Sequence, residues 1–419
     1  MTEFSTTPAP IQILRGRRIL LGVTGSIAAY KAAELASRLT QAGAQVDVML
    51  SQAAEAFVTP LTFRSVTGGQ AYREADLWGE QGHILHVELA QRADLFVIAP
   101  ATANTLARLA HGLADGLIPL AALAADCPLL VAPAMDAGMY QHPAVEANVQ
   151  LLVERGVRLA GPDHGRMASG LQGRGRLVEP ERLLGHIRLA LGAEGPLQGQ
   201  RIVVTAGGTQ EPVDAVRLLT NRSSGKQGFA LAQAALDRGA DVVLISAPTH
   251  LATPVGARRV ETASAEQMHL AVMAEIGQAD ALLMAAAVAD FRPAKAAPDK
   301  LKKADGVPQL LLEATADILL AVGEQRKKTG KPAVLVGFAA ESQALADNAS
   351  RKLAEKGLDL IVANDITAAE AGFEADTNQV TLIEADGSLQ ELPLMSKVEV
   401  AERVLERVED LLALPRSGA

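Results

Sequence analysis

A glycine-containing polar stretch, TAGGTQEPVDAVRLLTNRSSGKQG (residues 205–228), has the residue types of an anion-binding turn. It follows the apolar run 202–204 and leads into a helix-like pattern at 229–236. Free backbone N–H groups at a helix N-terminus attract anions. Any α/β fold needs glycines at such turns, so it is the NRSSGK run that favours a ligand site. The stretch is not a P-loop, because Thr220 and Gln227 stand where that motif needs Gly and Ser or Thr.

An acidic side chain and a basic cluster follow later in the sequence. Asp290 comes shortly after the apolar run 281–284, where it could contact a ribose, a base edge or a Mg²⁺ shell. Lys300, Lys302 and Lys303 place three ammonium groups within four residues. A solvated loop is the simpler explanation of such a cluster. Beside an anion-binding turn, a triphosphate clamp is favoured.

The apolar runs 334–336 and 360–362 end in segments that also suit a nucleotide. Phe338 follows the first run and could stack on a base. Lys352 and Lys356 lie four residues apart, so a helix would present both on one face. The second half therefore predicts a nucleotide site built from several strand ends.

Three loops in the first half follow expected strands. They are Gly25-Ser26-Ile27, residues 100–104 (PATAN) and residues 133–140 (PAMDAGMY). The first loop lacks the GxGxxG spacing, so dinucleotide binding is weakly supported. A serine hydroxyl at a helix N-terminus does suit a monophosphate. Each loop alone is more typical of an ordinary turn.

His83 and His86 are three residues apart in HILHVEL. They could be metal ligands on a helix, but no carboxylate–histidine set with zinc spacing accompanies them. A surface or capping role is the simpler explanation of His86. Since histidine can serve as a general base near neutral pH, a catalytic role beside the three loops is the alternative.

Length and composition restrict the class of protein. At 419 residues, 49% hydrophobic and 21% charged, the chain is expected to form two globular domains. Its net charge of −9 argues against a general nucleic-acid partner. The one cysteine, Cys127, excludes an intramolecular disulfide and suggests a reducing compartment. No secretory signal or membrane-spanning run is visible, so we expect a cytoplasmic protein with no membrane partner.

Apolar runs alternate with helical patterns in both halves, which predicts βαβ crossovers and mostly parallel sheets. The fold class is therefore α/β, with two doubly wound, Rossmann-like domains that bind ligands at the carboxyl ends of their strands. The expected strands are 18–23, 44–50, 94–99, 129–132, 202–204, 242–245, 281–284, 334–336 and 360–362. The expected divisions are a disordered tail (1–14), a first domain (15–190), a linker (191–200) and a second domain (201–419).

The end of the second half departs from the plain βα repeat. Residues 379–383 and 389–394 flank Ala-Asp-Gly-Ser, which predicts a β-hairpin. A final amphipathic helix is expected at 396–412.

On these motifs the first half resembles the flavin-dependent cysteine decarboxylases. The chain from about 17 to 411 resembles the bifunctional phosphopantothenoylcysteine decarboxylase/phosphopantothenate–cysteine ligases of coenzyme A biosynthesis. The resemblance implies a flavodoxin-like FMN domain in which His86 is the active-site base. It also implies flavin sites between the subunits of a trimer. The implied FMN contacts are Gly25, Ser26, Ile27, Ser51, Pro100, Thr102 and Asn104.

Three residues in two segments depart from the pattern of the decarboxylase family. The substrate motif of that family is PxMNxxMW, and here Asp136 replaces Asn between Met135 and Met139, while Tyr140 replaces Trp. An ionised Asp136 only accepts hydrogen bonds and would repel a substrate carboxylate, so a raised pKa would be needed. In the flap segment (166–176), Ser169 stands where the family has the Cys thought to donate a proton.

The second half matches the ligase pattern without departures at the quoted positions. The resemblance implies CTP as co-substrate, with Mg²⁺ at Asp290. Asn221 would hold an acyl-cytidylate formed from 4′-phosphopantothenate, and cysteine would then displace CMP. Ligase halves of this family dimerise, so the resemblance implies trimers joined by dimers in a large homo-oligomer such as a dodecamer. The implied CTP contacts are Asp290, Lys300, Ala316, Asp317, Ile318, Leu319, Phe338, Lys352 and Lys356.

Three hypotheses follow from these residues. The first is a bifunctional enzyme. The second is a ligase whose flavodomain is impaired by Asp136 and Ser169. The third makes the flavodomain a binding or regulatory module. A nicotinamide dehydrogenase is disfavoured, since neither half has GxGxxG after its first strand.

Overall fold

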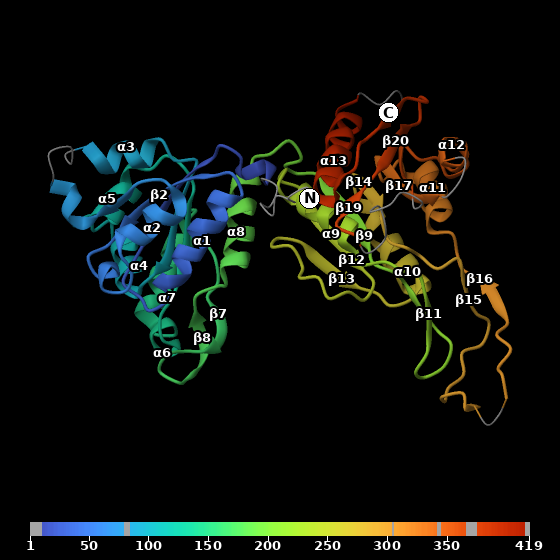
Figure 1. Ribbon diagram of the computed structural model, residues 1–419, viewed down its shortest axis with the longest axis horizontal. Coiled ribbons are helices and arrows are strands. Elements are labelled where there is room, and N and C mark those ends of the chain that lie inside the picture. The colour runs from blue at the N-terminus through green and yellow to red at the C-terminus, as the bar shows by residue number, and fades with distance from the viewer. Residues whose placement is uncertain (1–10, 79–83, 304–305, 342–344, 366–374, 415–419) are drawn as a thin grey trace, which may run out of the picture. The chain divides into compact units, whose positions relative to one another are not determined.

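The computed structural model describes residues 11–78, 84–303, 306–341, 345–365 and 375–414. The chain divides into two compact units, Met1–Gly192 and Ala193–Ala419 (Figure 1). Within the described residues, no helix is both long and apolar enough to cross a membrane.

The first unit is built on a fully parallel six-stranded sheet in the order β3-β2-β1-β4-β5-β6. This is the strand order of a doubly wound Rossmann sheet. The order in which successive strands join the sheet reverses between β1 and β4. Folds of this kind bind ligands at that point. The strands are β1 (Arg18–Val23), β2 (Gln45–Leu50), β3 (Ala71–Arg73), β4 (Leu95–Ala101), β5 (Leu129–Pro133) and β6 (Arg158–Leu159).

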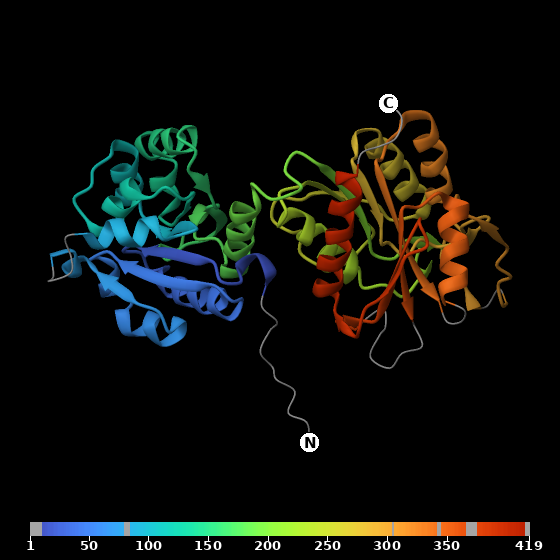
Figure 2. The ribbon, with the colours of Figure 1, turned by 90° about the horizontal axis from the view of Figure 1, so that it is seen from above.

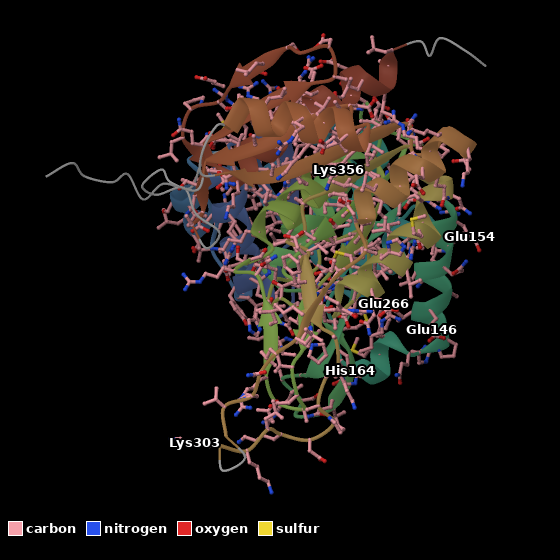
Figure 3. All side chains as sticks on the ribbon, turned by 90° about the vertical axis from the view of Figure 1, so that its right-hand side faces the viewer. Glu146, Glu154, His164, Glu266, Lys303 and Lys356 are labelled. Carbon is pink, nitrogen blue, oxygen red and sulfur yellow. The ribbon has the colours of Figure 1, made fainter. Side chains whose placement is uncertain are left out.

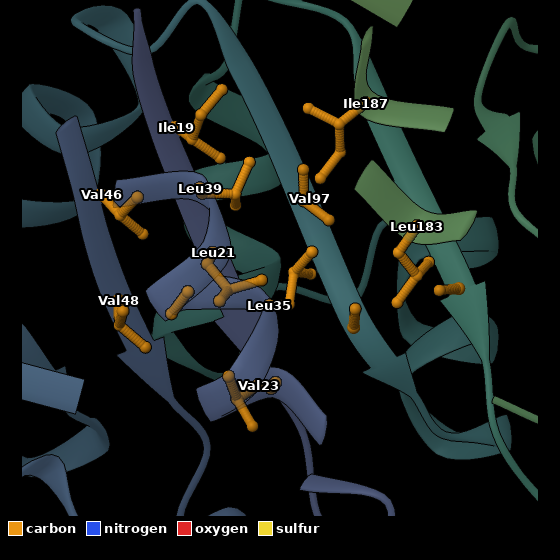
Figure 4. Close-up of a cluster of buried hydrophobic side chains, with 14 of the residues drawn as sticks. Ile19, Leu21, Val23, Leu35, Leu39, Val46, Val48, Val97, Leu183 and Ile187 are labelled. Atoms are coloured by element: carbon orange, nitrogen blue, oxygen red, sulfur yellow. The ribbon is translucent and has the colours of Figure 1, made fainter. Parts of the chain in front are cut away.

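Helices cover both faces of this sheet, because successive strand side chains point to opposite faces. Ile19 and Leu21 of β1 pack in one core with α1, α2 and α8 (Figure 4), while Leu20 packs in the other core with α3, α4, α5 and α7. A flap hairpin, β7 with β8, adjoins the short α6. The bounds are α1 (Ala29–Gln41), α2 (Pro60–Thr67), α3 (Leu85–Gln91), α4 (Ala103–His111), α5 (Leu117–Ala124), α6 (Ala137–Tyr140), α7 (Pro143–Glu154), β7 (Asp163–Arg166), β8 (Gln172–Arg176) and α8 (Pro180–Gly192).

The second unit repeats this strand order and then extends the sheet. Its strands run β13-β12-β9-β14-β17-β18-β20-β21, parallel up to β18 and antiparallel in the last two pairings. The predicted hairpin and final helix are confirmed as β20–β21 and α13. The strands are β9 (Arg201–Ala206), β12 (Asp241–Ser246), β13 (Arg258–Glu261), β14 (Ala281–Met284), β17 (Val334–Glu341), β18 (Leu360–Asp365), β20 (Val380–Glu384) and β21 (Leu389–Glu391).

Helices again lie on both faces of the sheet, as Figure 2 shows. Helices α10, α11 and α12 share one buried core, and α13 packs against α9. The bounds are α9 (Lys226–Leu236), α10 (Ala265–Glu275), α11 (Ile318–Thr329), α12 (Leu345–Lys356) and α13 (Lys397–Ala413).

Three short antiparallel pairs project from or close over this sheet, and none of them was predicted. The segment between β15 and β16 extends away from the body of the unit, and Lys303 lies near its far end (Figure 3). The pairs are β10 (Gln210–Pro212) with β11 (Leu218–Thr220), β15 (Phe291–Pro293) with β16 (Leu312–Ala314), and β19 (Thr377–Asn378) with β22 (Met395–Ser396).

The predicted fold class is confirmed, and two of the expected divisions need correction. In the expected tail, Gln12–Leu14 forms a helical turn, because the apolar Leu14 is buried in the first core. In the expected linker, Leu197 is buried and its N–H donates to the Arg238 carbonyl at 2.8 Å. The segment after α8 is therefore packed on the second unit.

Candidate active sites

A cavity of about 630 Å³ lies at the carboxyl ends of β1, β2 and β4 in the first unit. Two of the expected flavin contacts, Ile27 and Pro100, do not line this cavity, although Pro100 lies at the edge of the cavity. The predicted residues that do line it are Gly25, Ser26, Ser51, Thr102, Asn104, Met135 and Met139.

The loops at this cavity are fixed by short local contacts. A Cβ at Gly25 would lie 2.4 Å from the Ala53 Cβ, so this loop needs glycine. The Thr24 hydroxyl donates to the Pro100 carbonyl at 2.7 Å and accepts from the Thr102 N–H at 3.1 Å. The strand ends are thereby tied together around a cradle suited to a phosphate and a flat ring.

Three charged residues that the sequence reasoning missed also line this cavity. Glu74 accepts from the Leu117 N–H at 2.9 Å, and Arg108 pairs with Asp115 at 3.3 Å. Arg108 lies four residues after Asn104 on α4, so their spacing on one helical face was the available signal.

The structure does not bring His86 into this cavity. His86 is half-buried on α3, and its Nδ1 is a buried atom without a hydrogen-bond partner among the residues that the structure describes. His83 lies outside the described residues. Among the described residues, none places the His86 ring at this cavity.

Two of the three residues that depart from the decarboxylase family contact each other. The Ser169 hydroxyl donates to Asp136 Oδ2 at 2.6 Å, and the Gly138 N–H donates to Asp136 Oδ1 at 3.0 Å. These two hydrogen bonds hold the pKa of Asp136 below its usual range, and the one from Ser169 has the larger effect. Asp136 is therefore ionised at neutral pH, and the raised pKa that would let it donate is not found.

The flap carrying Ser169 is seated on α6 by its backbone. The Met135 N–H donates to the Gly175 carbonyl at 3.0 Å. A Cβ at Gly175 would lie 2.4 Å from the Met135 carbonyl oxygen, and one at Gly173 would lie 2.6 Å from the Ala137 Cβ. The two flap glycines permit this approach, and the Ser169–Asp136 bond fastens the tip.

Two adjoining cavities lie at the carboxyl ends of β9, β14, β17 and β18 in the second unit. The larger, of about 570 Å³, is bounded by residues 221–228. The smaller, of about 310 Å³, is bounded by residues 315–319. Asp290, Phe338 and Lys352 line both.

The glycine turn predicted to bind an anion forms one wall of the larger cavity. Gly225 precedes α9 with φ of +78°, a conformation that favours glycine. A Cβ at Gly228 would lie 2.5 Å from the Ala206 Cβ, so α9 begins directly on the end of β9. The N-terminus of α9 therefore faces the cavity, as an anion site requires.

Asn221 lies where the predicted acyl group would be held. Its amide nitrogen donates to the Val288 carbonyl at 3.1 Å, which joins the glycine turn to the segment carrying Asp290. Except for Lys300, all the expected CTP contacts line the smaller cavity. One of them is Lys356, whose Nζ lies 2.8 Å from Asp317 Oδ2. Lys300 is exposed on the extended β15–β16 segment and lines neither cavity.

Three polar residues in the larger cavity were not predicted as site residues. The Oδ1 atoms of Asn364 and Asn378 are buried without a hydrogen-bond partner among the described residues, which is typical of a site that awaits a polar ligand. Lys397 lines the same cavity and is 6% exposed. Burial, followed by repulsion from Lys226, lowers the pKa of Lys397.

Two family models match the chain, one for each unit. The flavoprotein model matches residues 10–191, and the model described as DNA/pantothenate metabolism flavoprotein C-terminal domain matches residues 197–412. A coenzyme A biosynthesis bifunctional protein CoaBC from Bacillus subtilis (strain 168) is 44% identical over 95% of this chain and 98% of its own length. The chain belongs to the CoaBC family.

A second curated relative agrees with this assignment. The CoaBC protein of Escherichia coli (strain K12) is 39% identical over 94% of this chain and 97% of its own length. Among solved structures, a C-terminal domain of CoaBC is 40% identical, covering 52% of this chain and 98% of that one, with a TM-score of 0.45. The FMN-dependent cysteine decarboxylase SpaF is 34% identical, covering 42% and 97%, with a TM-score of 0.36.

As a CoaBC protein, the chain is a bifunctional enzyme of coenzyme A biosynthesis, a phosphopantothenoylcysteine decarboxylase and a phosphopantothenate–cysteine ligase. The bifunctional hypothesis is thereby favoured over a ligase with a silent or purely regulatory flavodomain.

Proposed function

We propose that the second unit performs ligation through an acyl-cytidylate, with CTP in the smaller cavity and 4′-phosphopantothenate in the larger. The observation that carries this proposal is the convergence of Asp290, Phe338 and Lys352 on the boundary of two adjoining cavities. The pantothenate carboxylate attacks the α-phosphorus of CTP there, and pyrophosphate leaves. The amine of cysteine then attacks the acyl carbon, and CMP leaves.

Each group has a role that its position supports. Phe338 stacks on the base, and the ammonium groups of Lys352 and Lys356 bind phosphate oxygens. Asn221 orients the acyl group beside the N-terminus of α9. Lys300 would have to move with its exposed segment to reach the triphosphate, so we assign it a role only in a closed state.

Mg²⁺ would be held at Asp290. Among the described residues no cluster of three or more metal-ligating side chains exists, which fits an ion bound by one carboxylate together with substrate phosphates. An ion there would offset negative charge on the triphosphate.

We further propose that the first unit holds FMN in the 630 Å³ cavity. The fit is supported by Gly25, which leaves room for a close approach, and by the hydroxyls of Ser26, Ser51 and Thr102 around the cradle. FMN would supply hydride acceptance and return. Met135 and Met139 would cover the ring, and Asp136 and Ser169 would close the flap over the substrate.

A homo-oligomer would complete this site. His86 lies outside the cavity of its own chain, whereas Ile27 and Tyr30 beside the cradle are each 61% exposed. A neighbouring copy that covers these apolar groups could bring its own His86 to the flavin. In the second unit, the exposed Leu218, Phe291 and Leu312 of the short antiparallel pairs offer a second apolar contact for a dimer.

One experiment tests both halves. The purified yellow protein is given 4′-phosphopantothenate, cysteine and Mg²⁺ with CTP, and separately with ATP, and the products are identified by mass. We expect pyrophosphate, CMP and 4′-phosphopantetheine with CTP. Ligation that proceeds equally with ATP would overturn the assignment of CTP, and a dipeptide-like product that retains its carboxylate would overturn the decarboxylase assignment.

A further inference from the structure

The second unit contains a third cavity, of about 900 Å³, at the carboxyl ends of β12 and β13. Ser223 and Ser224 line both this cavity and the proposed 4′-phosphopantothenate cavity, so the glycine turn forms a common wall. The Thr249 hydroxyl donates to the Ser224 carbonyl at 3.2 Å and fixes that wall from the third cavity's side. No residue role assigned above accounts for this space.

Polar groups in the third cavity are incompletely satisfied. Arg259 Nε and Thr262 Oγ1 are buried without a hydrogen-bond partner among the described residues, and Thr262 is 7% exposed. The terminal nitrogens of Arg259 make only long contacts of 3.4 Å, to the Leu251 carbonyl and the Ser246 hydroxyl. Its nearest carboxylate, Glu261, lies 3.8 Å away on an 82% exposed side chain.

Arg259 is held as a rigid donor. Its guanidinium lies 5.5 Å from the centre of the buried Phe229 ring. A guanidinium fork of this kind binds a carboxylate with two parallel hydrogen bonds. Thr262 adds a hydroxyl close by. The cavity therefore suits a small molecule that carries a carboxylate and further polar groups.

We propose that this third cavity binds the amino acid co-substrate, cysteine, with its α-carboxylate on Arg259 and Thr262. The inference rests on the proposed function, which fills the other two cavities with CTP and 4′-phosphopantothenate and leaves the third substrate without a site. The amine of the bound amino acid would then attack the acyl carbon beside Asn221 across the common wall.

The step balances without a further reactant. The ammonium loses one proton to solvent, and the nitrogen lone pair forms the C–N bond. The C–O bond to the phosphate of CMP breaks, with its electron pair leaving on CMP. A second proton leaves the nitrogen as the amide forms. His250, which also lines the cavity, is available to accept a proton.

The test separates the two half-reactions of the full-length protein. Acyl-cytidylate formation is followed as isotope exchange between pyrophosphate and CTP, with 4′-phosphopantothenate and no amino acid. Ligation is followed with cysteine and with cysteamine, which lacks the carboxylate. Arg259→Gln is expected to keep the exchange rate, to raise the KM for cysteine roughly tenfold or more, and to abolish the preference for cysteine over cysteamine.

Matched variants keep the test decisive. Thr262→Val keeps the side-chain shape, and it is expected to raise the KM for cysteine several-fold without changing exchange. Arg258→Gln alters the neighbouring arginine, which pairs with Glu275 outside the cavity. It should change neither the KM for cysteine nor the exchange rate. If Thr262→Val leaves the KM for cysteine unchanged, or Arg259→Gln retains the preference for cysteine, the proposal is wrong. Absence of exchange in the unaltered protein would instead contradict the proposed function.

Discussion

The two units share one strand order but complete their sites in different ways. In the second unit, residues as distant in sequence as Asn221, Asp290 and Phe338 meet at adjoining cavities within one chain. In the first unit, the cradle is formed but His86 lies outside it. The same parallel sheet thus supplies a nearly complete ligand site in one case and part of a site in the other.

The difference lies in the segments added to the common sheet. The second unit adds β19, β20, β21 and α13, and Asn378 of β19 and Lys397 of α13 line the cavity. The first unit adds only the flap, and the tip of the flap bonds to α6 through Ser169 and Asp136. The proposed homo-oligomer would supply the remaining groups of the first site from another copy of the chain.

The substitution with the largest expected effect tests whether the flavin cradle, like the glycine turn of the second unit, is built by residues of one chain. In Gly25→Ala, the new Cβ would meet the Ala53 Cβ and backbone, which cannot move without shifting the end of β2. We expect loss of the flavin absorbance and at least a hundredfold loss of decarboxylation. Ligation, measured on the same sample, should be unchanged. A yellow variant with normal turnover would contradict the proposed cradle.

A second substitution tests whether the predicted lysines act as phosphate ligands. In Lys356→Met, the ammonium that now pairs with Asp317 is lost from the proposed CTP cavity. A charge-assisted hydrogen bond is worth about 1.5–3 kcal/mol, so the KM for CTP should rise roughly tenfold to a hundredfold. Lys328→Met, at the exposed end of α11, is the matched control and should leave the KM unchanged.

The Ser169–Asp136 pair predicts coupled effects in the first unit. Ser169→Ala removes the donor that holds down the pKa of Asp136. Since the pKa of Asp136 is depressed, the contact is present above the ordinary carboxyl range and weakens only as the pH falls below it. We expect the protection of residues 167–171 against amide hydrogen exchange, relative to the intrinsic rate at each pH, to be constant between pH 5 and 8 and to be several-fold weaker in the variant.

A double variant sharpens this prediction. Asp136→Asn with Ser169→Cys gives the pair found in the decarboxylase family. If the present pair acts as a unit, each single change should slow decarboxylation several-fold, and the double variant should be faster than the product of the single effects predicts. Strictly additive effects would mean that the observed hydrogen bond has no part in turnover.

The sequence predicted what short-range patterns encode. The strand ends, the glycine turn and the hairpin followed from apolar runs and turn residues, and most predicted site residues lie around the observed cavities. Lys397 and Asn378 were missed, since only the long-range pairing of the C-terminal strands brings them to the site. Lys300 is the opposite case, a residue that was predicted for the site but does not line it. The cluster of lysines around it suggested a phosphate clamp, whereas the fold leaves Lys300 on an exposed segment.

The smallest expected effect tests one of these missed residues. Burial and Lys226 lower the pKa of Lys397, so it loses its charge at lower pH than an ordinary lysine. If it binds an anionic group of 4′-phosphopantothenate, the KM for that substrate should rise a few-fold as the pH increases through the depressed pKa. Lys397→Met should show a higher KM without this rise, and the exposed Lys327→Met should keep it. A KM that is flat with pH in the unaltered protein would contradict this role and would leave Lys397 as a structural part of the cavity wall.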